Sequence, residues 1–260
     1  MPICCATSST LGSKSLNYHV NHDNSVCRWQ VTDIPIPVGI DLFSFDSSDE
    51  ACMARTCLIA VLERFNASNF GPKFQFVDHP SHSAFFVRFG GDHSSYANAF
   101  FPGSHPKDWY IDLFRPSLTL SEDQEQSLRN TPSRGEDISA AKAQALEQNL
   151  VKILMHEMLH VVGVRHCDAQ DTETMERCVR YPHDLSDDKN NEERLMERSL
   201  DWRIFSQLDW MNRTLQEIRE IYAMKGGDFL GCHRIRDVSW EVGAKQRKEI
   251  ALRNARCCIA

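Results

Sequence analysis

The stretch HEMLHVVGVRH, residues 156–166, carries the strongest signal in this chain of 260 residues. His156 and His160 are four residues apart, so on a helix their imidazoles leave the same face, about 40° apart in azimuth. Two nitrogen ligands at this spacing suit one tetrahedral zinc ion. Gly163 lets the backbone leave the helix, so that His166 can return as a third ligand. Three protein nitrogens leave a fourth position open, which is typical of a catalytic zinc rather than a structural one.

Glu157 follows the first histidine and is expected to lie beside the metal. Zinc lowers the pKa of its bound water towards about 7 and polarises a substrate carbonyl. Glu157 would then take the proton of that zinc-bound water and deliver it to the leaving amine, as general base and then general acid. The pattern therefore predicts a hydrolase with one catalytic Zn²⁺. A zinc-binding module without turnover is the alternative, but it leaves Glu157 without a role.

The pattern HExxHxxGxxH is the signature of the metzincin metalloproteases, and its flanks resemble a matrixin-like catalytic domain. The similar segments are YANAFFPGSHP (96–106), WYIDLF (109–114), QNLVKILMHEMLH (148–160) and FSQLDWMNRTLQEIREIY (205–222). The resemblance covers roughly residues 28–225. It implies a zinc-dependent metalloendopeptidase acting on protein or peptide substrates. A catalytically inactive zinc-binding module and a zinc hydrolase of small peptides stay open as alternatives.

The resemblance also implies roles for residues outside the zinc motif. An extended substrate would add as a strand to the main chain of Ala97, Asn98, Ala99 and Phe100. A methionine turn beneath the zinc is assigned to Met196 in LMERS, with Met211 and Met175 as competing candidates. The segment 197–208 would then form the wall of a specificity pocket. About 30 residues separate His166 from Met196, which is longer than in a compact matrixin.

Apolar periodicity predicts the secondary structure around these motifs. A helix capped by Ser47 or Ser48 is expected to reach about Phe65, and a long helix is expected from Asp137 to Gly163. The segment 29–45 is interpreted as an edge strand because it contains Pro35 and Pro37. The other expected elements are strands at 74–76, 85–89, 96–101 and 109–114, a loop over 115–136, an irregular stretch over 167–194 and a helix over 212–225.

The expected fold class is α+β and metzincin-like, with a twisted mixed sheet packed on the active-site helix. A smaller C-terminal subdomain, closed by a helix, would complete it. Three segments are expected along the chain: an extended or mobile N-terminal arm over 1–27, the metzincin-like catalytic domain over 28–227, and a basic C-terminal tail over 228–260.

Composition and the two chain ends limit the partners. Lys and Arg number 29 against 36 Asp and Glu, and this acidic balance argues against nucleic acid as a partner. No apolar run approaches the roughly 18 residues of a transmembrane segment.

The first twenty residues contain no readable signal peptide, although the family resemblance favours secretion. The C-terminal CCIA instead fits a prenylation box, with Cys257 as the acceptor of a lipid anchor on an intracellular protein. The compartment stays open.

Two weaker signals are also left open. A second structural zinc or a calcium ion near Asp92–His93 and His105 would need more ligands, because the family's fuller ligand pattern is incomplete there. Cys167 and Cys178 are eleven residues apart in the acidic stretch, where a disulfide and two reduced thiols are about equally favoured.

Overall fold

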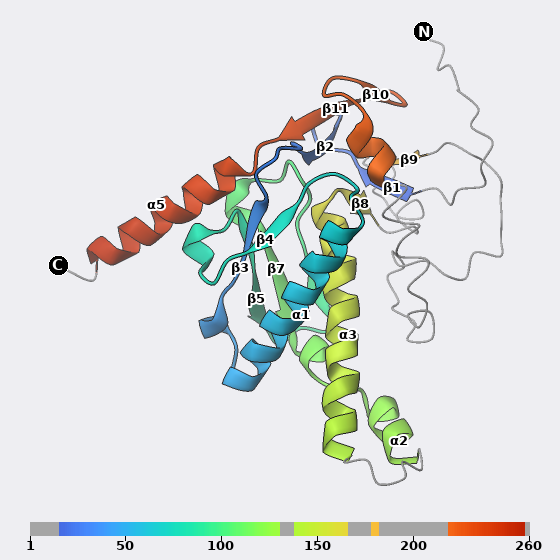
Figure 1. Cartoon of the computed structure of the whole chain (residues 1–260), viewed down its shortest axis with the longest axis vertical. Helices are drawn as coiled ribbons and strands as arrows, with labels where there is room; N and C mark the ends of the chain where they lie inside the picture. The colour runs from blue at the N-terminus through green and yellow to red at the C-terminus, as the bar shows by residue number, and fades with distance from the viewer. Residues whose placement is uncertain (1–15, 131–137, 166–177, 182–217, 258–260) are drawn as a thin grey trace.

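The computed structural model of the chain describes residues 16–130, 138–165, 178–181 and 218–257. Two long helices, α1 (Ser48–Ala67) and α3 (Ile138–Val161), lie side by side over a five-stranded sheet (Figure 1). A short helix, α2 (Glu122–Asn130), packs against α3. The last helix, α5 (Glu241–Cys257), extends away from the sheet on the other side. The chain therefore has a mixed α/β architecture.

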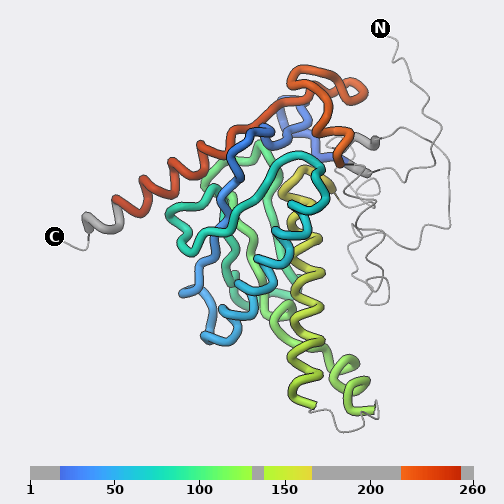
Figure 2. The backbone as a smooth tube through the Cα atoms, in the orientation of Figure 1, coloured from blue at the N-terminus to red at the C-terminus, as the bar shows by residue number. Residues whose placement is uncertain are grey.

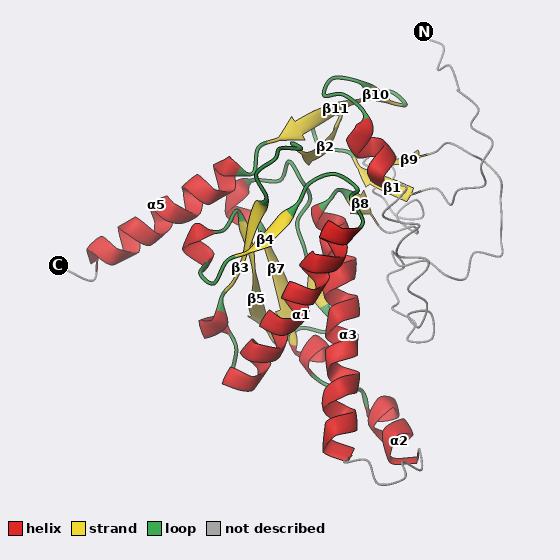
Figure 3. Cartoon of the chain, viewed as in Figure 1, coloured by secondary structure: helices red, strands yellow, loops and turns green. Residues whose placement is uncertain are grey.

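The central sheet has the strand order β4–β3–β5–β7–β6, in which only β6 runs antiparallel to its neighbour. Its strands are β3 (Ile36–Ile40), β4 (Phe74–Phe76), β5 (Phe85–Gly91), β6 (Ala97–Asn98) and β7 (Tyr110–Phe114). Figure 3 shows the strands as a layer behind α1 and α3. Side chains alternate between the two faces of a strand. Phe85 and Val87 are fully buried, whereas Phe86 points to the opposite face, where the Arg247 guanidinium of α5 lies 4.9 Å from its ring centroid.

Both long helices form where the sequence predicts them. Ser47 caps α1, because its side chain accepts a hydrogen bond of 3.2 Å from the backbone N–H of Glu50. The helix α3 ends at Val161, and Gly163 follows with a φ of +101°, a conformation that favours glycine. The backbone N–H of Gly163 donates to the carbonyl of His160 over 2.9 Å, which closes the helix end. The predicted stop at Gly163 is confirmed.

The prediction of an edge strand around Pro35 and Pro37 is wrong. The strand β3 lies between β4 and β5, in the interior of the sheet. Its ladder with β5 begins at Val38, one residue after Pro37, so the missing N–H leaves no β5 carbonyl without a donor. The Pro37 carbonyl still accepts a hydrogen bond of 2.8 Å from the N–H of Ala84. Proline is tolerated here because Pro37 precedes the residues paired with β5, although it is itself paired with Gln75 of β4.

The loop expected over 115–136 is also partly wrong, because it contains the short 3-10 helix η4 (Arg115–Leu118) and α2. A reciprocal capping box begins α2. The Ser121 hydroxyl accepts from the N–H of Gln124 at 3.3 Å, and the Gln124 side-chain oxygen accepts from the N–H of Ser121 at 3.1 Å. No side chain of α2 is buried, so apolar periodicity carries no signal for this helix.

The two ends of the described chain pair with each other. The strand β2 (Ser25–Trp29) is parallel to β11 (His233–Val238), which also pairs with β10 (Phe229–Leu230). Figure 2 shows the blue trace of β2 beside the red trace of β11. Strands and α5 thus occupy most of the segment expected as a basic tail over 228–260. The boundaries of the three expected segments stay predictions.

The last residues of the extended or mobile arm expected over 1–27 form strands. The strand β1 (Leu16–His19) lies between β8 (Val164–Arg165) and β9 (Cys178–Tyr181), all antiparallel. Tyr18, Val20 and Val26 are each only 1% exposed, so this segment contributes to the core. The strand β9 also replaces part of the irregular stretch expected over 167–194.

Several predictions lie outside the described residues. They are the pocket wall over 197–208 and the methionine candidates Met175, Met196 and Met211. The helix expected over 212–225 is described only from residue 218, and residues 218–223 are helical.

Candidate metal centre

The centre is built on the last two turns of α3. His156 and His160 are 5% and 6% exposed, and their ring centroids lie 5.0 Å apart with an interplanar angle of 88°. The i, i+4 spacing places the two rings one turn apart on the same face, as the sequence predicts. Met158 and Leu159, on the other faces of the helix, are fully buried. The two imidazoles therefore lie in an enclosed, largely apolar part of the molecule.

The tautomer of His160 follows from its hydrogen bond. Its Nδ1 lies 2.8 Å from the backbone carbonyl oxygen of Val164, in a buried contact. A carbonyl oxygen can only accept, so Nδ1 carries the proton and Nε2 of the neutral ring keeps its lone pair. Histidine ligands of metal ions commonly donate their second nitrogen to such a group, which fixes the ring and raises its basicity. His160 is thus prepared to bind a metal ion through Nε2.

Glu157 directly follows His156 on α3 and is 6% exposed. Its Oε2 is buried and has no hydrogen-bond partner within the described part of the chain. Burial raises the pKa of the Glu157 carboxyl from 4.5 to about 8. A divalent cation beside it would act in the opposite direction, because a nearby positive charge favours the carboxylate. Two adjacent imidazoles fit the ligand chemistry of zinc, and a buried carboxyl oxygen without a hydrogen-bond partner in the described ranges suits a place beside the ion.

The third predicted ligand, His166, lies outside the described residues. Within the described ranges, no group of three or more His, Cys, Asp or Glu side chains could hold a metal ion. The two α3 histidines are therefore brought together as predicted, whereas His166 as a ligand stays a prediction. The last described residue before it, Arg165, belongs to β8, which pairs with β1.

Two side chains beside the centre carry no sequence signal. The Phe101 ring packs edge-on against His160, with centroids 5.3 Å apart. The imidazole of His19 stacks on the Phe101 ring, with the centroids 4.2 Å apart and an interplanar angle of 10°. His19 reaches this place because β1 pairs with β8, and no local pattern reveals a pairing over such a sequence distance. Phe101 thus contacts the predicted metal ligand His160 directly, and His19 packs behind Phe101.

The predicted substrate strand is only partly a strand. Ala97 and Asn98 form β6, the last strand in the order of the sheet, and β6 lies next to α3. Ala99 and Phe100 follow β6 outside any strand. Phe100 is 6% exposed and its ring stacks on Trp109 at 5.9 Å, so its side chain belongs to the core. The sheet edge is thus next to α3, and its role in holding a substrate stays a prediction.

The residues considered for a second metal ion use their side chains locally. Nδ1 of His93 accepts a hydrogen bond from the N–H of Ser95 at 3.0 Å, and Nδ1 of His105 accepts from the N–H of Lys107 at 3.2 Å. Asp92 is highly exposed and lies 3.5 Å from Arg115. Nothing in the described ranges gathers them into a metal-binding group.

No protein-family model matches this chain, and neither does any curated protein sequence. The assignment of function therefore rests on the residues of the centre and on the motif that they form. Across the described helices, none is both long and apolar enough to cross a membrane. Cys257, the predicted lipid acceptor, is the last residue of α5, and prenylation stays a prediction.

Proposed function

We propose that the protein is a zinc-dependent metalloendopeptidase of metzincin type. The observation that supports this most is the arrangement of His156, Glu157 and His160 on the buried end of α3, with Nε2 of His160 left as a lone-pair donor. His166 would complete the ligand set. When bound, zinc supplies a Lewis acid that polarises the scissile carbonyl and makes water more acidic.

The chain's own residues would divide the remaining work. The carboxylate of Glu157 would accept the proton of the attacking water and deliver it to the leaving nitrogen. The main chain of Ala97 and Asn98 would hold the substrate in an extended conformation, because β6 pairs with β7 alone in the described part of the chain and its other edge offers both N–H and C=O groups. The burial of His156, Glu157 and His160 would keep bulk water away and strengthen the electrostatic interactions of these side chains.

A zinc-binding module without turnover and a hydrolase of small peptides are the outcomes to be separated from this proposal. Purified protein would be incubated with casein and with a peptide library, with a zinc chelator and after zinc is restored. We expect cleavage at internal bonds that the chelator abolishes and zinc restores. Cleavage only near peptide ends would indicate a small-peptide hydrolase, and zinc binding without cleavage would indicate an inactive module.

A matched pair of variants controls for changes in the helix. Glu157→Gln should abolish most cleavage, whereas Glu147→Gln should leave it unchanged, because Glu147 is exposed on the same helix. Equal cleavage by both variants would remove Glu157 from the reaction.

A further inference from the structure

Four successive backbone carbonyls follow the second histidine, and each accepts a hydrogen bond. Val161 accepts from the indole Nε1 of Trp29 at 2.8 Å, and Val162 accepts from the hydroxyl of Tyr222 at 3.4 Å. Gly163 accepts from the backbone N–H of His19 at 2.9 Å. The Val164 carbonyl accepts from Nδ1 of His160. The end of a helix normally leaves its carbonyls without helical partners, and here donors from distant parts of the chain supply them.

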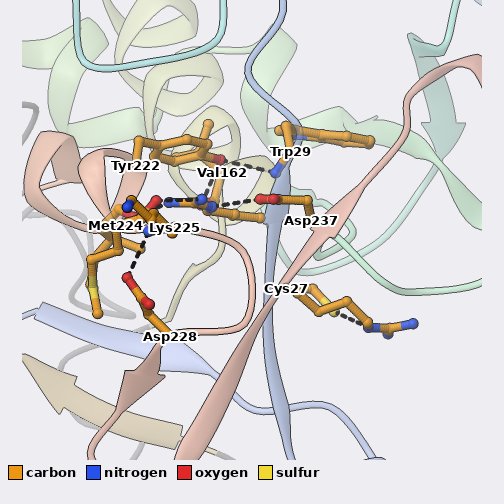
Figure 4. Close-up of polar contacts among 11 residues, drawn as sticks. Cys27, Trp29, Val162, Tyr222, Met224, Lys225, Asp228 and Asp237 are labelled. Atoms are coloured by element: carbon orange, nitrogen blue, oxygen red, sulfur yellow. Dashed lines mark hydrogen bonds and ion pairs between the residues drawn. The ribbon is translucent and has the colours of Figure 1, made fainter.

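Two of these donors are the side chains of Trp29 and Tyr222, and these two residues also share a hydrogen bond. The hydroxyl of Tyr222 accepts a hydrogen bond of 3.4 Å from the backbone N–H of Trp29 (Figure 4). Trp29 is fully buried and Tyr222 is 6% exposed. Burial raises the pKa of the Tyr222 hydroxyl, so it keeps its proton and can donate to Val162. Trp29 in β2 and Tyr222 in the helical residues 218–223 therefore both donate hydrogen bonds to the turn over residues 161–164.

Arg28 holds Tyr222 in place from the neighbouring position of β2. Its Nη2 donates to the Met224 carbonyl at 2.7 Å, Nη1 donates to the Ile221 carbonyl, and Nε pairs with Asp237 of β11 at 2.7 Å. Figure 4 shows two of these partners, Met224 and Asp237, together with Tyr222. Arg28 is only 5% exposed, so these charge-assisted hydrogen bonds form away from water. The arginine thereby fixes the backbone that carries the Tyr222 ring.

We propose that Trp29 and Tyr222 are positioning residues for His160. They hold the turn over 161–164, and the turn holds the Val164 carbonyl where Nδ1 of His160 can donate to it. The orientation of the imidazole, and with it the direction of Nε2, would thus depend on two side chains that touch neither the metal ion nor the substrate. This inference rests on the proposed function, in which His160 is a metal ligand.

The test uses metal binding rather than peptide cleavage. Tyr222→Phe removes one hydroxyl and keeps the ring, whereas Tyr110→Phe makes the same change on β7, away from the turn. Zinc affinity would be measured by competition with a chromophoric chelator, and the visible spectrum of the cobalt-loaded protein would be recorded at saturation. We expect Tyr222→Phe to lose roughly tenfold in zinc affinity, the scale found for partners behind metal ligands. Its cobalt spectrum should change, whereas Tyr110→Phe should match the wild type in both measurements.

The cobalt spectrum separates positioning from stability, because a merely less stable protein gives the same spectrum once it is folded and loaded. If His160→Ala loses zinc binding but Tyr222→Phe keeps the affinity and the cobalt spectrum of the wild type, the positioning role alone is overturned. Equal binding by wild type and His160→Ala would overturn the proposed function, and the positioning role with it. Asp237→Asn gives a second variant if Tyr222→Phe does not fold. It should weaken zinc binding in the same direction, and an unchanged affinity there would contradict the inference.

Discussion

Nδ1 of His160 and the carbonyl oxygen of Val164, four residues further along the chain, are 2.8 Å apart in a buried hydrogen bond. The contact connects the last turn of α3 to the first residue of β8. It also decides which ring nitrogen carries the proton and which keeps its lone pair, because the carbonyl must receive the Nδ1 proton.

This hydrogen bond predicts the tautomer of His160 in the metal-free protein. Long-range proton–nitrogen NMR spectra of labelled protein should show Nδ1 protonated and Nε2 bare, with the signals assigned by their loss in His160→Gln. His105 provides an internal control, because its Nδ1 accepts from the N–H of Lys107 and its proton should therefore be on Nε2. Protonation of His160 at Nε2 in the neutral ring would show that the hydrogen bond to Val164 does not form.

Gly163→Ala should destabilise the protein more than Gly91→Ala. Both glycines have positive φ, +101° and +90°, which costs a side-chain-bearing residue roughly 1–2 kcal/mol. A Cβ at Gly163 would also come within 3.2 Å of the Cys27 carbonyl, whereas nothing lies within 4 Å of one at Gly91. Urea unfolding of both variants would give the two free energies. An equal loss in both would mean that the Cys27 contact does not matter.

The local patterns of the sequence predict the core of this molecule well. The cap at Ser47, the stop at Gly163 and the two histidines on one helix face all depend on residues within a few positions of one another. The structure confirms each of them. Such features follow from helix geometry alone, so one sequence is enough to find them.

The features that the sequence does not predict depend mostly on contacts between distant residues. No period or cap signals that β2 pairs with β11, or that Tyr222 reaches the carbonyl of Val162. The helix α2 was missed for another reason, since it buries no side chain, although its capping box at Ser121 and Gln124 was a readable signal. The interior position of β3 depends on where β5 begins relative to Pro37, which is a matter of register.

Arg28→Met should be strongly destabilising, by about 2–4 kcal/mol, because Asp237 and two backbone carbonyls lose a buried cationic donor. Arg55→Met is the matched control. Its guanidinium pairs with Asp78 at 2.8 Å, but the two side chains are 40% and 80% exposed, so its loss should cost less than about 1 kcal/mol. Thermal and urea unfolding would measure both. Similar losses of unfolding free energy for the two variants would contradict the role of Arg28 in fixing the backbone around Tyr222.

Cys57 should make the protein less stable in alkali. Burial raises the pKa of its thiol from 9.0 to about 12, so the unfolded chain loses this proton first. The stabilising contribution of the neutral thiol is therefore fully present below pH 9.0 and is lost as the pH rises towards about 12. The slope is at most about 1.4 kcal/mol per pH unit. Urea unfolding across this range should show a flatter pH dependence in Cys57→Ala than in Cys52→Ala, where the thiol is exposed. Identical slopes would contradict the burial of the Cys57 thiol.

The most direct test of the proposed function measures bound zinc and peptide hydrolysis on the same preparations of three proteins. The wild type should carry about one zinc ion per chain and cleave peptides. Glu157→Ala should keep the zinc and lose on the order of 10²–10⁴ in rate, because Glu157 acts as a base and not as a ligand in the proposed mechanism. His160→Ala should lose both the zinc and the activity. A full equivalent of zinc in His160→Ala, or unchanged turnover in Glu157→Ala, would contradict the assignment of this centre.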